Sequence, residues 1–264
     1  MICLDVSLRM RGLTRKTTLL SLRFISDMHL EENRPALTRA FLHFLETDAL
    51  QAKALYLLGD IFNFWIGDDA MTDFHRDVAK ALKELTTSGT DVFIMHGNRD
   101  FALGESFCKQ SGCTLLKDPS VITPFGKPIL LMHGDLLCTQ DVSYQRMRRV
   151  LHNPFIKYLL LRLPLKLRLK IANKARKISK SSTRKKATSI VDVTQQEVLR
   201  IMEKHQTTCL IHGHTHRPAV HDLQVEIQGK PLPAKRYVLG DWSDQQGWKI
   251  TLEKDDIQLS AFNF

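Results

Sequence analysis

The feature that most constrains this chain is a series of apolar runs, several of which end in Gly, Asp or His. Six of these runs lie at residues 22–27, 54–60, 91–97, 129–135, 209–214 and 236–242. Their length and their Leu, Ile and Val content are typical of the buried strands of an α/β domain. We therefore expect polar side chains to gather where these strands end, which is where ligands bind.

Five polar motifs lie at those ends. In chain order they are Asp27-Met28-His29, Gly59-Asp60, Gly97-Asn98-Arg99-Asp100, His133-Gly134-Asp135 and Gly213-His214-Thr215-His216. Alternate residues of an extended segment point the same way, so D-x-H and H-x-H each present two side chains together. Carboxylate, amide and imidazole groups suit Mn²⁺ or a similar divalent ion better than a thiophilic metal. Each motif alone is a weak signal, because a lone GD or HGD usually forms a turn, but the ordered set is specific.

The ordered set resembles the calcineurin-like metallophosphoesterase superfamily, whose pattern is D-x-H, GD, GN(H/R)(D/E), H and GHxH. The resemblance spans residues 22 to about 242. It implies an α/β fold in which a sandwich of two β-sheets is flanked by helices, with two metal ions about 3.5–4 Å apart that activate water and stabilise phosphoryl charge. The implied ligands are Asp27, His29 and His216 for one ion, Asn98, His133 and His214 for the other, and Asp60 as the bridge.

Arg99 stands where many members of this superfamily have histidine. Histidine can protonate a departing alkoxide, but arginine holds its proton because its pKa is above 12. Arginine can instead clamp a phosphate and neutralise growing charge. Arg99 therefore indicates a good leaving group, such as the phosphate of a phosphoanhydride, unless it is only a surface residue that the loop tolerates. The predicted catalytic residues are Asp60, Asn98, Arg99 and His214.

The formal charge of +10 comes from one segment. Residues 144–190 contain 15 Lys or Arg and no Asp or Glu. Within it, Asn153-Pro154 predicts a helix start, Leu163-Pro164 its end, and the apolar spacing through residues 167, 171, 175 and 178 a second helix. Thr194 with Glu197 predicts a capping box and another helix. We interpret residues 142–193 as a basic helical cap inserted into a metallophosphoesterase domain at 21–264, after a loose extension at 1–20.

A narrower resemblance rests on LYLLGDIFNFWIGDD at 55–69, HGNRDF at 96–101 and the basic helical segment. These resemble the UDP-2,3-diacylglucosamine pyrophosphatases of lipid A biosynthesis in Gram-negative bacteria. Such enzymes direct water to the α-phosphorus of UDP-2,3-diacylglucosamine and release UMP and 2,3-diacylglucosamine 1-phosphate (lipid X). The resemblance implies substrate contacts from Asn98, Arg99, Asp141, Ser179, Thr183, Lys186 and His214, and Tyr144 is a further candidate. Candidates for an acyl-facing surface, unless they only pack the cap, are Leu151, Phe155, Leu159, Leu163 and Leu167.

The basic amphipathic helices also suggest a membrane partner. A cationic helical pair can rest on an anionic bilayer, and no apolar run reaches the ~18 residues of a spanning helix. We therefore expect peripheral binding at the cytoplasmic face of the bacterial inner membrane. The five cysteines form no CxxC pair and indicate neither disulfides nor a zinc ribbon. No protein partner is predicted.

Two alternatives stay open. A nuclease or a dinucleotide polyphosphate hydrolase of the same superfamily could track nucleic acid with the basic segment, but that segment lacks interleaved stacking aromatics, so no nucleic acid is expected. A membrane scaffold without catalysis would not need the complete ligand set.

Around the site, we expect Asp100 and Asp135 to orient ligand histidines, and Asp68 and Asp69 to support their loop.

Overall fold

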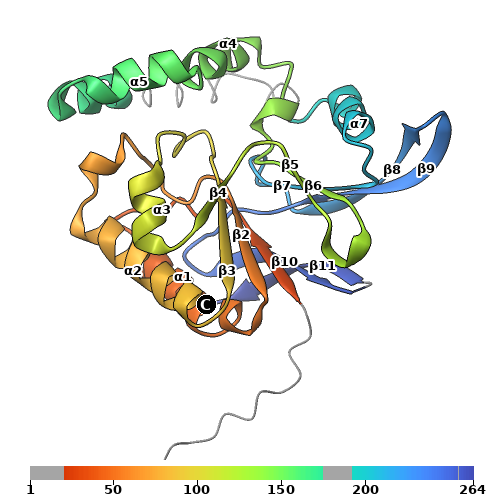
Figure 1. Ribbon diagram of the computed structural model, residues 1–264, viewed down its shortest axis with the longest axis horizontal. Coiled ribbons are helices and arrows are strands. Elements are labelled where there is room, and N and C mark those ends of the chain that lie inside the picture. Colours follow the sequence, from red (N-terminus) through yellow and green to blue (C-terminus); the bar gives the residue numbers. More distant parts are fainter. Residues whose placement is uncertain (1–20, 175–191, 255) are drawn as a thin grey trace, which may run out of the picture.

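The computed structural model describes residues 21–174, 192–254 and 256–264 (Figure 1). The expected extension at 1–20 and the expected contact residues Ser179, Thr183 and Lys186 lie outside this described part. So does the end of the second cap helix that the apolar spacing predicts.

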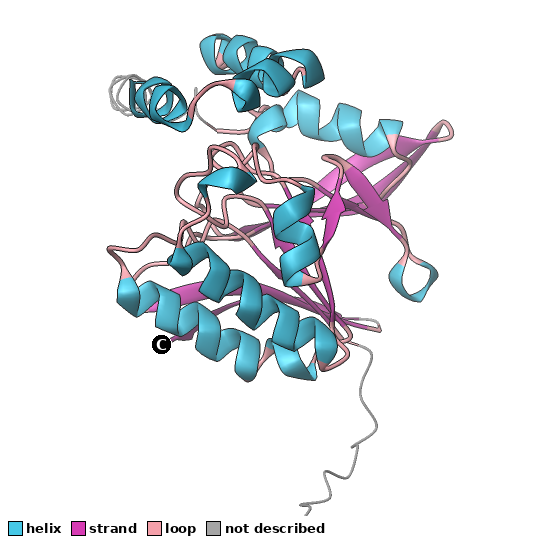
Figure 2. Ribbon diagram, turned by 60° about the vertical axis from the view of Figure 1, so that its left-hand side comes forward, coloured by secondary structure: helices cyan, strands magenta, loops and turns pink. Residues whose placement is uncertain are grey.

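Two mixed β-sheets form the centre of the molecule, which confirms the predicted sandwich (Figures 1 and 2). The six-stranded sheet has the order β11-β10-β1-β2-β3-β4, and the five-stranded sheet has the order β5-β6-β7-β9-β8. Strands β1 to β4 pair in parallel, as do β6, β7 and β9. The strand bounds are β1 Leu22–Ile25, β2 Ala54–Leu58, β3 Asp91–Met95, β4 Thr114–Leu116, β5 Ser120–Ile122, β6 Ile129–Leu131, β7 Cys209–His212, β8 Ala219–Ile227, β9 Lys230–Val238, β10 Gln246–Glu253 and β11 Asp256–Asn263.

Helices cover the outer faces of both sheets. Helices α1 (Pro35–Glu46), α2 (Asp73–Thr87) and α3 (Glu105–Ser111) flank the six-stranded sheet, and α7 (Gln195–Lys204) packs on the five-stranded sheet. Short 3₁₀ turns lie at η1 Ala49–Gln51, η2 Asp68–Ala70, η3 Pro124–Gly126 and η4 Asp135–Leu137. None of the helices in the described residues is long and apolar enough to cross a membrane.

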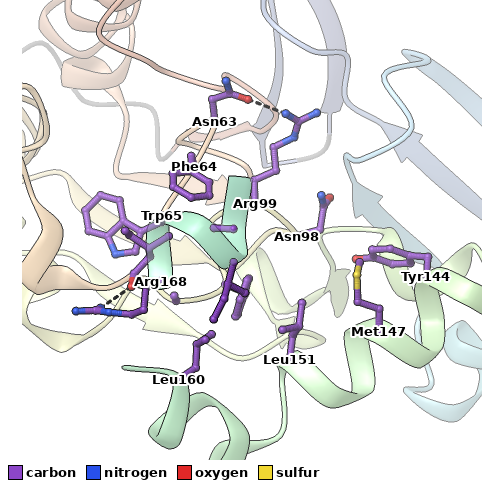
Figure 3. Close-up of a pocket in the computed structure, with 15 residues that line it drawn as sticks. Asn63, Phe64, Trp65, Asn98, Arg99, Tyr144, Met147, Leu151, Leu160 and Arg168 are labelled. Atoms are coloured by element: carbon purple, nitrogen blue, oxygen red, sulfur yellow. Dashed lines mark hydrogen bonds between the residues drawn. The ribbon is translucent and has the colours of Figure 1, made fainter. Parts of the chain in front are cut away.

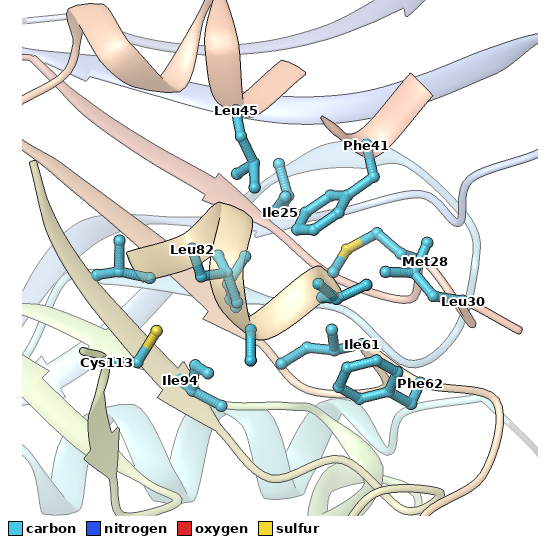
Figure 4. Close-up of a cluster of buried hydrophobic side chains, with 14 of the residues drawn as sticks. Ile25, Met28, Leu30, Phe41, Leu45, Ile61, Phe62, Leu82, Ile94 and Cys113 are labelled. Carbon is cyan, nitrogen blue, oxygen red and sulfur yellow. The ribbon is translucent and has the colours of Figure 1, made fainter. Parts of the chain in front are cut away.

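The central strands β1, β2, β3, β6 and β7 are mostly apolar because both of their faces are largely buried. Ile25 of β1 and Ile94 of β3 point toward α1 and α2, where they meet Phe41 and Leu82 (Figure 4). The alternate residue Phe24 points into the space between the sheets. Burial on both sides is expected of parallel strands between two layers. It leaves the strand ends as the place for polar chemistry.

The cap lies above the edge of the sandwich where β1 to β3 end. It consists of α4 (Val142–Leu151), α5 (Pro154–Arg162) and the helical turns at 165–174 (Figures 1 and 2). As predicted, Asn153 caps α5 by accepting hydrogen bonds from the backbone of Phe155 and Ile156. Lys157 Nζ ties the cap to the body by donating to the carbonyl of Phe101 at 2.7 Å.

Helix α7 begins where the sequence predicts, but the predicted capping box does not form. Thr194 makes no side-chain cap bond, and its hydroxyl accepts a hydrogen bond from Thr139 at 2.7 Å instead. The tertiary contact therefore takes the hydroxyl that a local cap would use.

Candidate metal centre

The seven predicted metal ligands converge at one edge of the sandwich. They come from the loops that follow five strands: Asp27 and His29 after β1, Asp60 after β2, Asn98 after β3, His133 after β6, and His214 and His216 after β7. The carboxyl ends of parallel strands meet at one edge of each sheet, so residues far apart in the sequence are brought within bonding distance of one another.

The backbone is strained at these positions. Among the described residues, eight other than glycine have a positive φ, and five of the eight are predicted ligands: Asp27, His29, Asp60, His214 and His216. Such conformations cost about 1–3 kcal/mol each and concentrate at functional sites. The loops are therefore shaped to aim side chains at a common point.

The first group of ligands contains Asp27, His29 and His216, whose ligand atoms lie within 4.8 Å of one another. His216 Nε2 is 3.3 Å from Asp27 Oδ1 and 3.3 Å from His29 Nε2. The other oxygen of Asp27 accepts hydrogen bonds from Ser26 Oγ and from the backbone of His214. Asp27 Oδ1 and His29 Nδ1 are buried and have no hydrogen-bond partner among the described residues. A divalent cation would satisfy these buried atoms, so the group fits a metal.

The second group is centred on Asn98. Its Oδ1 lies 3.1 Å from His133 Nε2 and 3.0 Å from His214 Nδ1. Asp60 lies between the groups, with Oδ1 3.9 Å from His133 Nε2 and Oδ2 3.8 Å from His29 Nδ1. His133 Nδ1 is 2.9 Å from the carbonyl of Leu58, which fixes the ring so that Nε2 faces the site. Oxygen and imidazole donors on both sides of one carboxylate suit two divalent ions.

Burial and mutual charge shift the pKa values of these groups strongly. Burial raises the pKa of Asp60 to about 7. Burial would lower the pKa of His133, but Asp60 and Asp27 outweigh it and raise that pKa to about 9. The pKa of His216 rises to about 10 against burial, because Asp241 and Asp27 stabilise its charged form. In the metal-free site, protons bound to Asp60, His133 and His216 therefore offset the buried negative charge. Bound cations would replace these protons.

The residues expected to orient the ligand histidines act differently. Asp100 accepts hydrogen bonds from the backbone of Gly97 and Ile61, both at 2.7 Å, and so joins the loops after β2 and β3. Asp135 accepts from the hydroxyl of Tyr144 and from Arg148 Nε. The expectation for both was wrong, because these carboxylates bind backbone amides or the cap.

Two contributors were missed by the sequence analysis. Asp241 Oδ2 lies 3.4 Å from His216 Nδ1, and its position at the end of the apolar run 236–242 could have revealed it. Asn63 Oδ1 accepts a 2.6 Å hydrogen bond from Arg99 Nη1 (Figure 3). Arg99 Nε is 3.5 Å from Asp60 Oδ2, so the guanidinium lies at the rim of the centre.

Comparison with known proteins shows which family the chain belongs to. The family model of calcineurin-like phosphoesterases matches residues 20–218. The chain belongs to this family. A UDP-2,3-diacylglucosamine hydrolase of Pseudomonas fluorescens strain Pf0-1 is 56% identical over 240 residues, which cover 91% of this chain and 95% of that one. The protein of the same name from Azotobacter vinelandii strain DJ is 56% identical over 246 residues, with 93% and 98% covered. The solved structure of an archaeal phosphodiesterase is 12% identical, with 92% and 99% covered and a TM-score of 0.45.

In this calcineurin-like phosphoesterase, an apolar pocket opens directly beside the metal centre (Figure 3). Asn98, Arg99 and Tyr144 line its metal side. The apolar lining comes from both the body and the cap and includes Trp65, Phe101, Met147, Leu151, Leu160 and Ile171. The ring of Tyr144 stacks near that of His214, with centroids 6.2 Å apart, and so bridges the pocket and the metal centre.

Most of the residues expected to face acyl chains lie elsewhere. Of the five, only Leu151 lines this pocket. Phe155, Leu159 and Leu167 are 67%, 46% and 43% exposed, so they point away from the body. The spacing of apolar residues identifies a helix face, but α5 has apolar residues on two faces, and Leu160 is on the inner one.

Two further expectations concern the start of α4 and the loop at 63–72. Asp141 caps α4 by accepting from the backbone of Tyr144 at 3.0 Å, and it does not line the pocket. Asp68 accepts hydrogen bonds from Trp65 Nε1, Gly104 and Phe107, which confirms its predicted role in loop support.

Proposed function

We propose that this phosphoesterase hydrolyses the diphosphate of UDP-2,3-diacylglucosamine to UMP and 2,3-diacylglucosamine 1-phosphate, a step of lipid A biosynthesis. The observation that carries the proposal is the direct opening of a metal centre into an apolar pocket beneath a basic cap. A substrate with a diphosphate and two acyl chains needs polar and apolar surfaces side by side. The relatives named above, at 56% identity, carry the same activity in their names.

Two divalent ions, which we propose to be Mn²⁺, would be held in the two groups of ligands described above. Asp27, His29 and His216 would hold one, Asn98, His133 and His214 the other, and Asp60 would contact both. When bound, such a pair supplies activation of water and neutralisation of phosphoryl charge.

The remaining chemistry belongs to the side chains at the rim. Arg99 is 36% exposed at its side chain, so it can reach a phosphate of the substrate while Asn63 holds it. Its guanidinium would bind the diphosphate and offset the negative charge that grows on the departing lipid phosphate. Protonation of that group is not required, because a phosphate is a good leaving group near neutral pH. Asn98 and His214 border the same space, and Asp141, Tyr144, Ser179, Thr183 and Lys186 are the further proposed contacts.

The outward face of the cap supports peripheral binding to an anionic bilayer at the cytoplasmic face of the inner membrane. Phe155 and Tyr158 of α5 are 67% and 54% exposed, and Arg162 lies 4.9 Å from the ring centre of Tyr158. Exposed aromatic and apolar groups beside cations are suited to the interface of an anionic membrane. The proposal would be abandoned if the protein did not bind anionic vesicles at low salt.

The first experiment is a single incubation of the purified protein with Mn²⁺ and UDP-2,3-diacylglucosamine in H₂¹⁸O, with both products analysed by mass spectrometry. We expect the label in UMP and none in the lipid phosphate, because water attacks the uridine-side phosphorus. An Asp60→Ala variant, which lacks the shared carboxylate, should give no product. If wild-type protein with two bound metal ions gives no turnover, UDP-2,3-diacylglucosamine is not its substrate. That result would favour a nucleotide or nucleic-acid substrate.

A further inference from the structure

Among the arginines in the described part of the cap, Arg168 has the least exposed side chain. Arg168 belongs to the helical turns at 165–174, and its side chain is 3% exposed, whereas Lys166 and Lys170 on the same turns are exposed. The guanidinium donates from Nη1 to the carbonyl of Ile66 at 2.7 Å and to Asp69 Oδ1 at 2.8 Å, and from Nη2 to Asp69 Oδ2. Arg168 therefore binds both a backbone carbonyl and a carboxylate of the loop at 63–72.

The loop is shaped to receive this side chain. Gly67 has a φ of +129°, a conformation that L side chains rarely adopt. A Cβ at Gly67 would lie 2.4 Å from Arg168 Nη1, 2.7 Å from Asp69 Oδ1 and 2.9 Å from Leu161 Cδ2. Any residue other than glycine would push the guanidinium out, so the backbone conformation and the arginine depend on each other.

The contacts of Arg168 with Ile66 and Asp69 lie between two apolar pockets. Both pockets share Phe64, Trp65 and Ile66 as part of their lining. The pocket beside the metal centre continues along the cap to Arg168 and Ile171, whereas the second is lined on the cap side by Leu165 and Leu169. Figure 3 shows Arg168 beside Trp65, at the far end of the first pocket from Asn98.

We propose that Arg168 is a positioning residue whose contacts with Ile66 and Asp69 latch the cap over the apolar pocket and thereby set the affinity for acylated substrate. The inference rests on the proposed function, because it requires a substrate with acyl chains. Asp69 is 61% exposed at its side chain, and an exposed ion pair alone contributes little. The buried guanidinium, the Ile66 carbonyl and the fitted Gly67 make this contact specific. Arg168 lies away from the ligand groups, so the latch acts on binding and leaves the chemical step intact.

The test compares Arg168→Met and Asp69→Asn with the matched control Lys170→Met, which removes the same charge from an exposed position on the same turns. For UDP-2,3-diacylglucosamine we expect KM to rise about tenfold in the first two variants, with kcat changed by less than about twofold. The control should match wild type. Hydrolysis of bis(p-nitrophenyl) phosphate, which has no acyl chain, should change by less than about twofold in all three. In the double variant, KM should be no higher than in Arg168→Met, because both changes break one contact.

Hydrogen exchange provides a readout that needs no substrate. Amides at 165–174 should exchange faster in Arg168→Met and Asp69→Asn, and at the wild-type rate in Lys170→Met. Unchanged exchange and unchanged KM would overturn the latch, and so would equal losses on both substrates, which would indicate general damage. If wild-type protein hydrolyses bis(p-nitrophenyl) phosphate but not UDP-2,3-diacylglucosamine, the proposed function fails, while the exchange data still decide whether the contact holds the cap.

Discussion

Arg99 Nη1 donates a 2.6 Å hydrogen bond to Asn63 Oδ1, and this bond links the loop after β3 to the loop after β2. Asn63 Nδ2 in turn donates to Glu31 Oε2 at 2.6 Å in the loop after β1. The three loops that supply Asp27, Asp60 and Asn98 are thus joined to the guanidinium by one chain of hydrogen bonds. The direction in which Arg99 points therefore depends on Asn63, which is only 8% exposed.

We expect Asn63→Ala to lower kcat on the proposed diphosphate substrate by about tenfold, which corresponds to about 1.4 kcal/mol. The guanidinium would keep its charge but lose its fixed orientation. Steady-state kinetics with metal analysis of the same sample would measure the effect. Two bound ions and an unchanged kcat would show that Asn63 does not position Arg99.

Arg99→His should retain both metal ions and lose rate on the anhydride by about a hundredfold. A neutral imidazole cannot clamp a phosphate in two places, and the proton it can give is not needed by a phosphate leaving group. The matched variant Arg99→Lys keeps the charge but not the planar fork, so its rate should lie between the two. If Arg99→His reacts as fast as wild type, Arg99 has no part in the chemical step.

The metal ligands could be predicted from the sequence because each motif is local. Asp27 with His29, and His214 with His216, carry their own spacing, and the strand that precedes each pair is a continuous apolar run. The fold then has only to bring parallel strand ends together. Asn63 could not be predicted in this way, because its importance comes from a contact with Arg99 that exists only after folding.

Most of the residues predicted to face acyl chains lie outside the apolar pocket, for a different reason. A helix with apolar residues on two faces buries the one that the neighbouring elements select. In α5, Leu160 lines the pocket, while Phe155 and Leu159 are exposed. The burial of Arg168 could not be predicted either. Its sequence context of alternating Leu and Lys or Arg gives no sign that one cation is buried.

Asp100→Ala should destabilise the metal-free protein by about 3 kcal/mol or more. The carboxylate is 1% exposed and accepts hydrogen bonds from the backbone of Asp60, Ile61, Phe62 and Gly97. Its removal leaves buried amides without partners, and each costs about 1–3 kcal/mol. Urea unfolding would measure the loss, and Asp100→Asn, which keeps one acceptor, should lose less. Equal stability of all three proteins would show that water replaces the carboxylate.

The affinity for Mn²⁺ should rise with pH, because several ligands of the metal-free protein hold protons at neutral pH. Burial raises the pKa of Asp60 to about 7, and carboxylates raise the pKa of His133 to about 9. A raised pKa means that the proton is bound below that pH and must leave before the metal can bind. Loss of the protons of Asp60 and His133 alone should therefore raise the affinity roughly a thousandfold from pH 6 to pH 8.

Isothermal titration at both pH values, each in two buffers of different ionisation enthalpy, would give the affinity and the number of protons released. Asp27 should contribute nothing to the slope. Although burial opposes it, the close approach of His216 and the charge of His133 hold the pKa of Asp27 well below its usual range, so this carboxylate is already ionised. Asp60→Asn should release fewer protons per metal bound, because the amide carries none to lose. An affinity independent of pH, with no proton release, would mean that the ligands are ionised before the metal arrives and that the protons assigned to Asp60 and His133 are absent.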